Sequence, residues 1–358
     1  MIGMPSINIV FTTQAAITSR RSGQGTVAII VLDANEAVQG YKELLNKNDI
    51  PAALGEDNRA YIAQAFVGNV NRPARVLLYV LPADAANYAD ALAVLETKHF
   101  DWLVAPPEIT AALAIEVAVW VRHQRDEQHR VYKAVLPHYA ANDEAIVNFV
   151  TDDITINDVA FGAEGYCSRI AGLIAGTPLV QSATYVLLEE ISDVERKTNT
   201  EMDAIVDAGG FLLFHDGMKV KTGRAVTSLV TVTPDKSGQL KKIKILEALD
   251  LINFDLRMLM QDNYIGKMEN SYDNKCVLIT AIQEYFRVLE NEGILQAGQS
   301  RVGIDMDAQI EYLRGEGVDV SRLSDQQIRE YKTGTHVFLA ASVRVLDAIE
   351  DIDLTIDY

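Results

Sequence analysis

Short apolar runs rich in β-forming residues alternate with amphipathic stretches through the first half of the chain, and this alternation restricts the fold more than any other feature. The apolar runs occupy residues 26–32, 75–81, 102–105 and 132–136. Helical spacing of apolar residues fills the gaps, over residues 36–45, 58–66, 85–97 and 108–128. Buried strands that alternate with helices predict a largely parallel sheet covered on both faces. We therefore expect an α/β domain over residues 25–185.

The helix predicted over residues 108–128 is apolar around most of its circumference in its first half, as Ile115, Val117, Val119 and Val121 show. A helix without a polar face is normally covered on more than one side. We therefore expect this helix to be packed between two layers.

A different pattern begins near residue 186 and predicts a second domain. Helical spacing over residues 198–208 is followed by β-rich runs at 209–214 and 220–232. Apolar residues three and four positions apart then predict two longer helices, over residues 243–259 and 275–292.

Two shorter helices follow, and polar residues mark where they begin. Asp305 is placed to cap the first of them. Ser324 with Gln327 forms a capping box at the start of the second. The second domain is therefore expected to be largely helical toward its end.

Both ends of the chain alternate apolar and polar residues with a period of two, which predicts strands with one apolar face. The apolar positions are Ile7, Ile9 and Phe11 at the N-terminus and Ile352, Leu354, Ile356 and Tyr358 at the C-terminus. Chain ends fray unless something holds them, and an apolar strand edge is a template for pairing. Two alternatives follow: the ends pair within their own subunit, or they add strands to a neighbouring copy.

The charge balance argues against several classes of partner. The chain has 50 acidic and 32 basic residues and a net charge of −18. A charge of this sign repels phosphate backbones and anionic lipid surfaces, so we expect neither nucleic acid nor a membrane as a partner.

A transmembrane helix would need about 18 or more consecutive apolar residues, and the sequence has no such run. Cys167 and Cys276 are the only cysteines, which fits synthesis in a reducing compartment.

The usual nucleotide-binding signatures are absent from the sequence. A dinucleotide fold needs a glycine-rich turn after its first strand, whereas this chain has Asp33, Ala34, Asn35 and Glu36 there. Gly266-Lys267 lacks both the first glycine and the hydroxyl residue of a phosphate-binding loop. We therefore predict no cofactor.

Residues with catalytic or metal-binding potential are also poorly arranged. His123 and His129 lie six positions apart on a predicted helix and cannot share one metal ion. We therefore predict no metal site and no catalytic residues. The alternative is an α/β enzyme with its active site in a cleft between the domains and Asp33 as a carboxylate at a strand end.

Two stretches of opposite charge stand out. Residues 219–244 hold seven basic residues and one acidic residue, whereas residues 347–358 hold five acidic residues and no basic one. The two stretches are therefore complementary. Either an acidic partner covers the basic stretch, or its lysines form a solvated face.

Several sequence blocks of the second domain form an ordered series: Gly223-Arg224 with the run 226–232, then residues 241–243, 262–267, 270–275, 334–339 and 346–351. In these blocks the chain resembles the contractile tail sheath proteins of bacteriophages and phage-tail-like bacteriocins. The resemblance covers roughly residues 200–358 and the N-terminal residues 5–13. It implies a structural protein rather than an enzyme, without cofactors.

The resemblance implies an assembly. Hexameric rings of the subunit would stack helically around an inner tail tube protein, and contraction would drive the tube through a cell envelope. The partners would be further copies of the chain, the tube, and baseplate and terminator proteins. Such a protein would be made in the bacterial cytoplasm and mature in a virion tail or a released phage-tail-like particle.

The resemblance also assigns a role to each segment. Residues 1–24 and 350–358 would be arms from neighbouring subunits that complete a β-sheet in an inner sheath-assembly domain, residues 186–349. Residues 25–185 would form an outer α/β domain, and flexible links would lie near residues 22–25 and around Glu350. A short helix before the C-terminal arm would contact the tube, which makes Asp325, Arg329, Glu330 and Lys332 candidate contacts.

Overall fold

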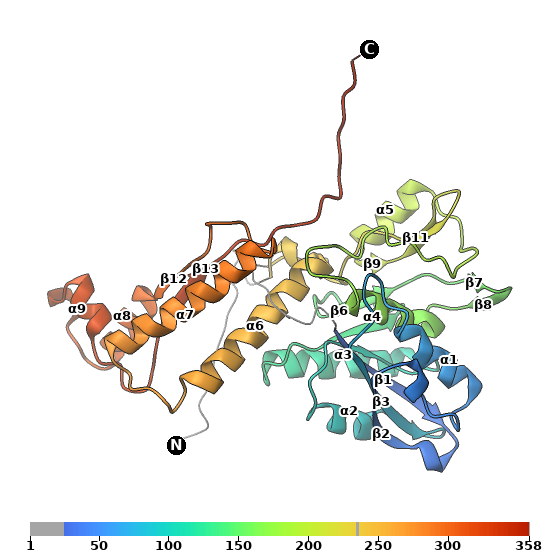
Figure 1. The fold of residues 1–358 in the computed structure, drawn as a ribbon, viewed down its shortest axis with the longest axis horizontal. Helices are drawn as coiled ribbons and strands as arrows, with labels where there is room; N and C mark the ends of the chain where they lie inside the picture. Colours follow the sequence, from blue (N-terminus) through green and yellow to red (C-terminus); the bar gives the residue numbers. More distant parts are fainter. Residues whose placement is uncertain (1–24, 234–235, 358) are drawn as a thin grey trace. The chain divides into compact units, whose positions relative to one another are not determined.

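The computed structural model describes residues 25–233 and 236–357, which form two compact units (Figure 1). The larger, here called the α/β unit, comprises the described residues from 25 to 247 together with 347–357. The smaller, here called the helical unit, comprises residues 248–346. The described chain therefore leaves the α/β unit once and returns to it for its last residues.

A seven-stranded sheet forms the centre of the α/β unit. In spatial order its strands are β2 (Gly40–Leu44), β3 (Arg75–Pro82), β1 (Thr26–Asp33), β4 (Trp102–Val104), β5 (Lys133–Pro137), β6 (Ile146–Phe149) and β9 (Gly210–Phe211). Every neighbouring pair is parallel except β2 with β3. The predicted α/β fold with a largely parallel sheet is confirmed.

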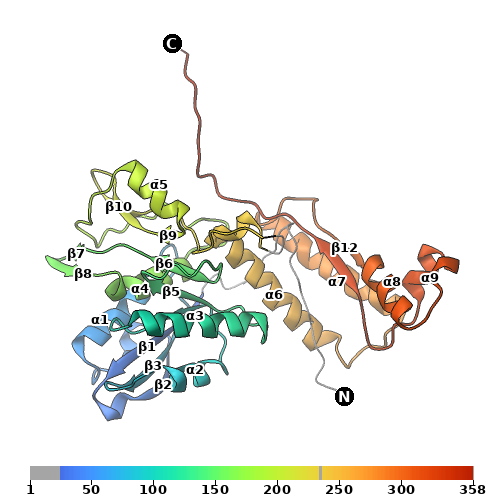
Figure 2. The same cartoon turned by 180° about the vertical axis from the view of Figure 1, so that it is seen from behind.

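Helices cover both faces of this sheet, and Figure 2 shows α2 and α3 on one of them. The helices are α1 (Glu56–Ala65) and α4 (Cys167–Ala175) on one face, and α2 (Ala89–Leu95) and α3 (Ala111–Asp126) on the other. Successive residues of β1 point to opposite faces, so Ile29 packs in the first core and Ile30 in the second. Both side chains are fully buried.

The rest of the α/β unit consists of short elements. They are α5 (Asn199–Asp207), the hairpin of β7 (Ile154–Ile156) and β8 (Val159–Phe161), and the hairpin of β10 (Leu213–His215) and β11 (Val220–Thr222). Single 3-10 turns occur at Glu36–Val38, Lys47–Asp49, Glu164–Tyr166 and Gly238–Lys241. The strand predicted over residues 220–232 is wrong beyond Thr222, where only an isolated bridge between Val226 and Lys242 continues the pairing.

The helix predicted over residues 36–45 is wrong. A 3-10 turn capped by Asn35 is followed by Gly40, whose φ of 88° lies outside the helical region, and then by β2. Leu44 at the end of β2 is buried in the core, whereas Glu43 beside it in the same strand is exposed. Pairing with β3 therefore decides a segment whose apolar spacing also fits a helix.

The helix α3 is covered on one side rather than two. Val117 and Val121 are fully buried, but Ile115 and Val119 are about half exposed. The expectation of two covering layers is therefore wrong, because the sheet lies against one face of the helix only.

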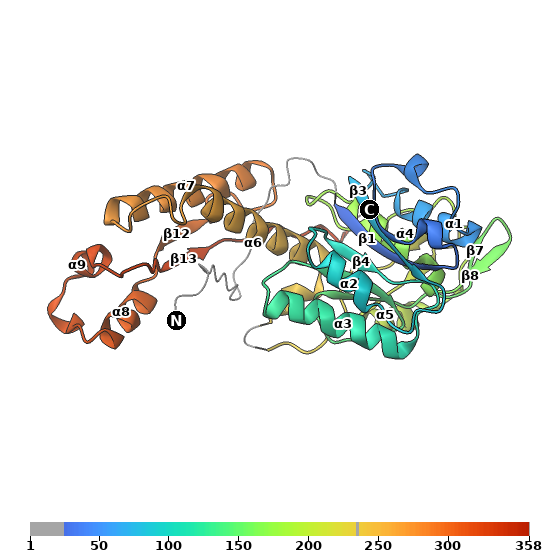
Figure 3. The same ribbon diagram turned by 90° about the horizontal axis from the view of Figure 1, so that it is seen from below.

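The helical unit contains two long helices and a strand pair. In chain order its elements are α6 (Ile243–Asn263), which begins in the α/β unit, α7 (Tyr272–Asn291), β12 (Arg301–Ile304), α8 (Met306–Gly315), a 3-10 turn (Val320–Arg322), α9 (Asp325–Glu330) and β13 (Leu339–Ser342). The helix α7 packs against β12 (Figure 3). Both predicted caps are confirmed: Asp305 accepts from the backbone of Ala308, and Ser324 forms a capping box with Gln327.

Candidate functional site

The end of the chain carries apolar side chains that its own unit does not bury. Residues 352–357 belong to no helix or strand of the described chain, and Figure 1 draws them as a plain extended ribbon. Ile352, Leu354 and Ile356 are 79%, 77% and 72% exposed. Three large aliphatic side chains at alternate positions form an apolar strip that water contacts on every side, and such a strip marks an interaction surface.

The other predicted arm positions cannot be compared with the structure. Ile7, Ile9, Phe11 and Tyr358 lie outside the described residues.

The chain just before this strip is held by polar contacts. The side chain of Glu350 is only 8% exposed. Its Oε1 atom accepts hydrogen bonds from Ser182 Oγ at 2.9 Å and Thr184 Oγ1 at 2.6 Å. Its Oε2 atom lies 3.8 Å from Arg224 Nε and 3.7 Å from Lys242 Nζ. The predicted flexible link around Glu350 is therefore wrong at this residue, and the exposed strip begins after it.

Two further acidic residues flank Glu350 and pair with the same cations. Asp347 forms an ion pair with Lys242, and Asp351 forms one with Arg224. The hydrogen bond from Arg224 to Asp351 is the main cause that raises the pKa of Arg224. The complementary charges seen in the sequence thus meet within one chain, and Arg224 and Lys242 do not belong to a solvated face.

Backbone pairing brings the two cations together. The amide of Thr227 donates to Lys241 O at 2.7 Å, and the amide of Ile243 donates to Ala225 O at 3.2 Å. These bonds align residues 225–227 antiparallel to 241–243, so Arg224 and Lys242 reach the same carboxylate.

The helical unit presents a strand pair with few neighbours. The strands β12 and β13 are antiparallel, with Val302 opposite Ala341 and Gly303 opposite Ala340. They form a two-stranded sheet, so within the described chain each strand has one unpaired edge. Unpaired edges offer backbone donors and acceptors to further strands.

The four candidate tube-contact residues lie on or just after α9. Asp325, Arg329 and Glu330 are exposed on the helix, and Lys332 is exposed beyond its end. The buried side of the helix is fixed by Ile328, whose carbonyl accepts a hydrogen bond from the buried Gln309 of α8. The structure therefore leaves these four charged groups accessible together.

Asp33, the carboxylate of the alternative enzyme interpretation, has a structural role. It accepts hydrogen bonds from the amides of Gly55 and Asn35, both at 2.9 Å, and from Asn58 Nδ2 at 3.0 Å. The hydrogen bond from Gly55 is the main cause that lowers the pKa of Asp33. The carboxylate therefore ties the loop after β1 to the start of α1.

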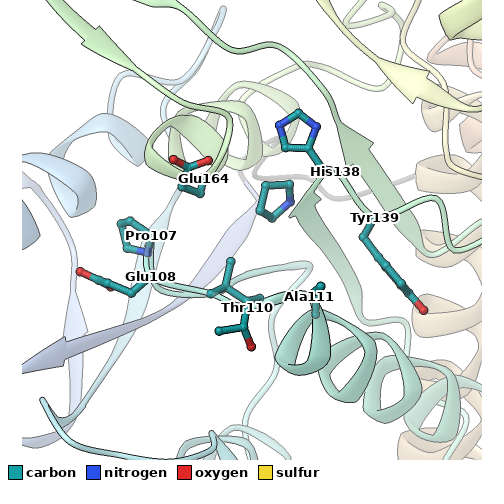
Figure 4. Close-up of a pocket in the computed structure, with 10 residues that line it drawn as sticks. Pro107, Glu108, Thr110, Ala111, His138, Tyr139 and Glu164 are labelled. Carbon is teal, nitrogen blue, oxygen red and sulfur yellow. The ribbon is translucent and has the colours of Figure 1, made fainter.

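A pocket of about 380 Å³ lies where β4 and β5 end, close to the start of α3 (Figure 4). Its polar lining residues include Glu108, Thr110, His138 and Glu164. The imidazole Nε2 of His138 is already 3.0 Å from Asp152, a residue outside the lining. Within the described chain no three potential ligands gather to hold a metal ion.

Cys167 is a buried free thiol whose pKa is raised well above the usual value by burial. Its sulfur donates to the carbonyl of Ala163 at 3.3 Å. A thiol that stays protonated in this way is a poor nucleophile.

Comparison with known proteins identifies the family of this chain. Two sequence profiles match it, described as phage tail sheath protein central domain over residues 82–228 and phage tail sheath C-terminal domain over residues 235–358. It is also 35% identical over 361 residues to a tail sheath protein of the Clostridium phage phiCD119, with 99% of both chains covered. The chain belongs to the phage tail sheath family. The predicted relation to tail sheath proteins is confirmed.

Solved structures support the same fold. The chain is similar to the sheath tail protein of Desulfitobacterium hafniense, with a TM-score of 0.69, 18% identity and coverage of 84% of this chain and 94% of that one. It is also similar to the PVC sheath complex of an extracellular contractile injection system in its contracted state, with a TM-score of 0.65, 11% identity and coverage of 100% and 98%. Across its described residues this sheath family member has no helix with the length and hydropathy needed to cross a membrane.

Proposed function

We propose that this sheath family member polymerises by lending both of its ends to neighbouring copies. Hexameric rings of the subunit stack helically around an inner tail tube, and contraction of the polymer drives the tube through a cell envelope. The observation that carries this proposal is the exposed apolar strip formed by Ile352, Leu354 and Ile356. Covering a strip of this kind with a partner removes apolar surface from water, which favours association.

The strand pair β12–β13 is the acceptor in this proposal. Its two open edges leave room for one strand from the C-terminal arm, residues 350–358, and one from the N-terminal arm, residues 1–24. Each added strand contributes several hydrogen bonds worth about 1 kcal/mol net apiece. Each apolar side chain that becomes fully buried contributes a further 1.5–3 kcal/mol, roughly.

The proposal also gives the remaining segments the roles that the resemblance to tail sheath proteins implies. Residues 186–349 form the inner assembly domain and residues 25–185 the outer domain. The exposed charges of Asp325, Arg329, Glu330 and Lys332 contact the tube, and baseplate and terminator proteins bind the two ends of the polymer. The subunit is made in the bacterial cytoplasm and works in a phage tail or a released phage-tail-like particle.

Contraction of this kind requires no nucleotide. The energy is stored when subunits assemble in an extended lattice that is less stable than the contracted one, and subunits then turn as rigid bodies. Strand pairing suits this change because it keeps neighbours connected while their bodies turn.

Electron microscopy of the concentrated protein tests the proposal. The full chain is expected to give hollow cylinders or sheets. Deletion of residues 352–358, or of residues 1–13, should leave subunits that melt at the same temperature but do not polymerise. Cylinders like those of the full chain from either deletion would contradict the arm assignment.

A peptide experiment distinguishes strand pairing between copies from strand pairing within one subunit. A synthetic peptide of residues 350–358 should bind the protein that lacks residues 352–358. The matched control peptide carries serine at Ile352, Leu354 and Ile356 and should not bind. Equal binding of the two peptides would show that the apolar strip is not what the acceptor recognises.

A further inference from the structure

The residues that contact the Glu350 carboxylate come from three segments that lie far apart in the sequence. Ser182 and Thr184 come from the loop after α4, Arg224 follows β11, and Lys242 lies at the start of α6. These four residues together with Glu350 are called the Glu350 clasp. All five belong to the α/β unit.

The hydroxyl groups of the clasp are prepared to donate to a carboxylate. Thr184 Oγ1 accepts a hydrogen bond from the amide of Ala225 at 3.0 Å, and Ser182 Oγ accepts one from the amide of Thr184 at 3.2 Å. Each hydroxyl has a single hydrogen, and both hydroxyl oxygens lie within hydrogen-bond distance of Glu350 Oε1; they are also 2.8 Å from each other, where either can be the donor. The two cations lie 3.8 Å and 3.7 Å from the other carboxylate oxygen, which faces positive charge but has no hydrogen-bond partner among the described residues.

The burial of Glu350 contrasts with its apolar neighbours in the chain. Ile349 is 86% exposed and Ile352 is 79% exposed, whereas the Glu350 side chain is 8% exposed. A carboxylate is costly to bury unless its charge and its hydrogen-bonding sites are matched. The chain therefore buries its charged residue and leaves its aliphatic residues in water, the reverse of what folding alone favours.

The position of Glu350 also fixes the phase of the exposed strip. Side chains two residues apart share one face of an extended strand. Glu350 therefore lies in register with Ile352, Leu354 and Ile356 when the segment is extended. An anchor at Glu350 sets where the strip starts, and the remaining residues to Tyr358 reach at most about 26–29 Å from it.

We propose that the Glu350 clasp positions the C-terminal arm, holding its first residue on the α/β unit so that the apolar strip is presented to a neighbouring copy at a fixed place and in a fixed phase. This inference rests on the proposed arm exchange. Glu350 acts here as a positioning residue, and tension on the arm passes to Arg224, Lys242 and the segments that carry them.

The test is Glu350→Gln in the full chain, which keeps the shape of the side chain and removes its charge. The loss of charge-assisted contacts is expected to raise the critical concentration for polymerisation about tenfold. Asp353→Asn is the matched control, because it removes one acidic charge three residues later, outside the clasp, and should change the critical concentration less than about twofold.

A second measurement separates positioning from general stability. Below the critical concentration, amide hydrogen exchange over residues 347–351 should be slower in the unchanged chain than in Glu350→Gln, while the sheet strands β1 and β3 exchange alike in both.

A charge swap that combines Arg224→Glu with Asp351→Arg should polymerise better than either single change. If Glu350→Gln fails to fold, the double variant Asp347→Asn with Asp351→Asn replaces it, since the side chains of Asp347 and Asp351 are 42% and 79% exposed.

The outcomes are distinguishable from failure of the arm exchange itself. If deletion of residues 352–358 abolishes polymers but Glu350→Gln polymerises and exchanges like the unchanged chain, the clasp is overturned and the arm exchange stands. If the deletion leaves polymers intact, the arm exchange is overturned and the clasp with it.

Discussion

Isoleucine has opposite surroundings in the sheet of the α/β unit and in the C-terminal segment. Ile29 of β1 is fully buried between strands and helices of its own unit, whereas Ile352 is 79% exposed. The side chains are identical, so the difference lies in what the chain around them offers. Burial of Ile29 stabilises the subunit, and we infer that burial of Ile352 is left for assembly. The comparison predicts that changes in the two regions affect different measurements.

Serine at Ile352, Leu354 and Ile356 together should have the largest effect, and only on assembly. Each apolar side chain that is no longer buried on assembly weakens association by roughly 1.5–3 kcal/mol, so the association constant should fall by more than about 1,000-fold. Unfolding by denaturant should be unchanged within about 0.5 kcal/mol, because these side chains are already exposed. Sedimentation of polymers measures the first quantity.

A control on the polar face sharpens this result. Asp353→Asn with Thr355→Ser changes the other face of the same strand and should leave polymers intact. Loss of polymers in this control as well would mean that the strip has no special role.

Ile29→Ala should act in the opposite way. Removing most of a fully buried side chain from the central strand should lower the free energy of unfolding by about 2–5 kcal/mol. Polymers of the molecules that remain folded should look unchanged in micrographs. Val119→Ala, at a half-exposed position on α3, is the control and should change stability by less than about 0.5 kcal/mol.

Asp143 should make the α/β unit sensitive to acid. This buried carboxylate is 2.8 Å from Arg122 and 3.6 Å from Lys236. Burial alone would raise its pKa, but Lys236, a hydrogen bond from Ala145 and Arg122 outweigh burial and lower it. A lowered pKa contributes stability above the unfolded value, near pH 3.8, and this stability is lost as the pH falls through the folded value.

The expected effect of Asp143→Asn is a loss of about 1–3 kcal/mol at neutral pH, with a smaller further loss on acidification than in the unchanged chain. Denaturant unfolding at several pH values measures it. The exposed Asp203→Asn is the control and should leave the pH profile unchanged. An identical acid response in Asp143→Asn would assign the sensitivity to other carboxylates.

Charge reversal on α9 should have the smallest effect. Arg329→Glu with Lys332→Glu changes exposed groups, whose ion pairs are worth up to about 1 kcal/mol each. Co-assembly with the tube should weaken by roughly tenfold or more, while self-association of the sheath subunit is unchanged. Unchanged co-assembly would remove α9 from the proposed tube contact.

Local features of the chain were predictable because their causes are local. The caps at Asp305 and Ser324 depend on residues three positions apart, and both are confirmed. The segment that became β2 was not predictable from spacing alone, because its apolar residues fit either structure and the edge of β3 decided between them. The same holds for α3, whose exposed Ile115 and Val119 look like core residues in the sequence.

The candidate site likewise combines features that the sequence predicts with features that only the folded chain decides. The period of two in residues 352–358 is a property of the sequence, and so is the opposite charge of the basic and acidic stretches. That Glu350 rather than another carboxylate meets Ser182, Thr184, Arg224 and Lys242 follows only from the folded chain. These partners lie more than 100 positions away in the sequence, and no local pattern encodes which of many similar charges the backbone will bring within reach.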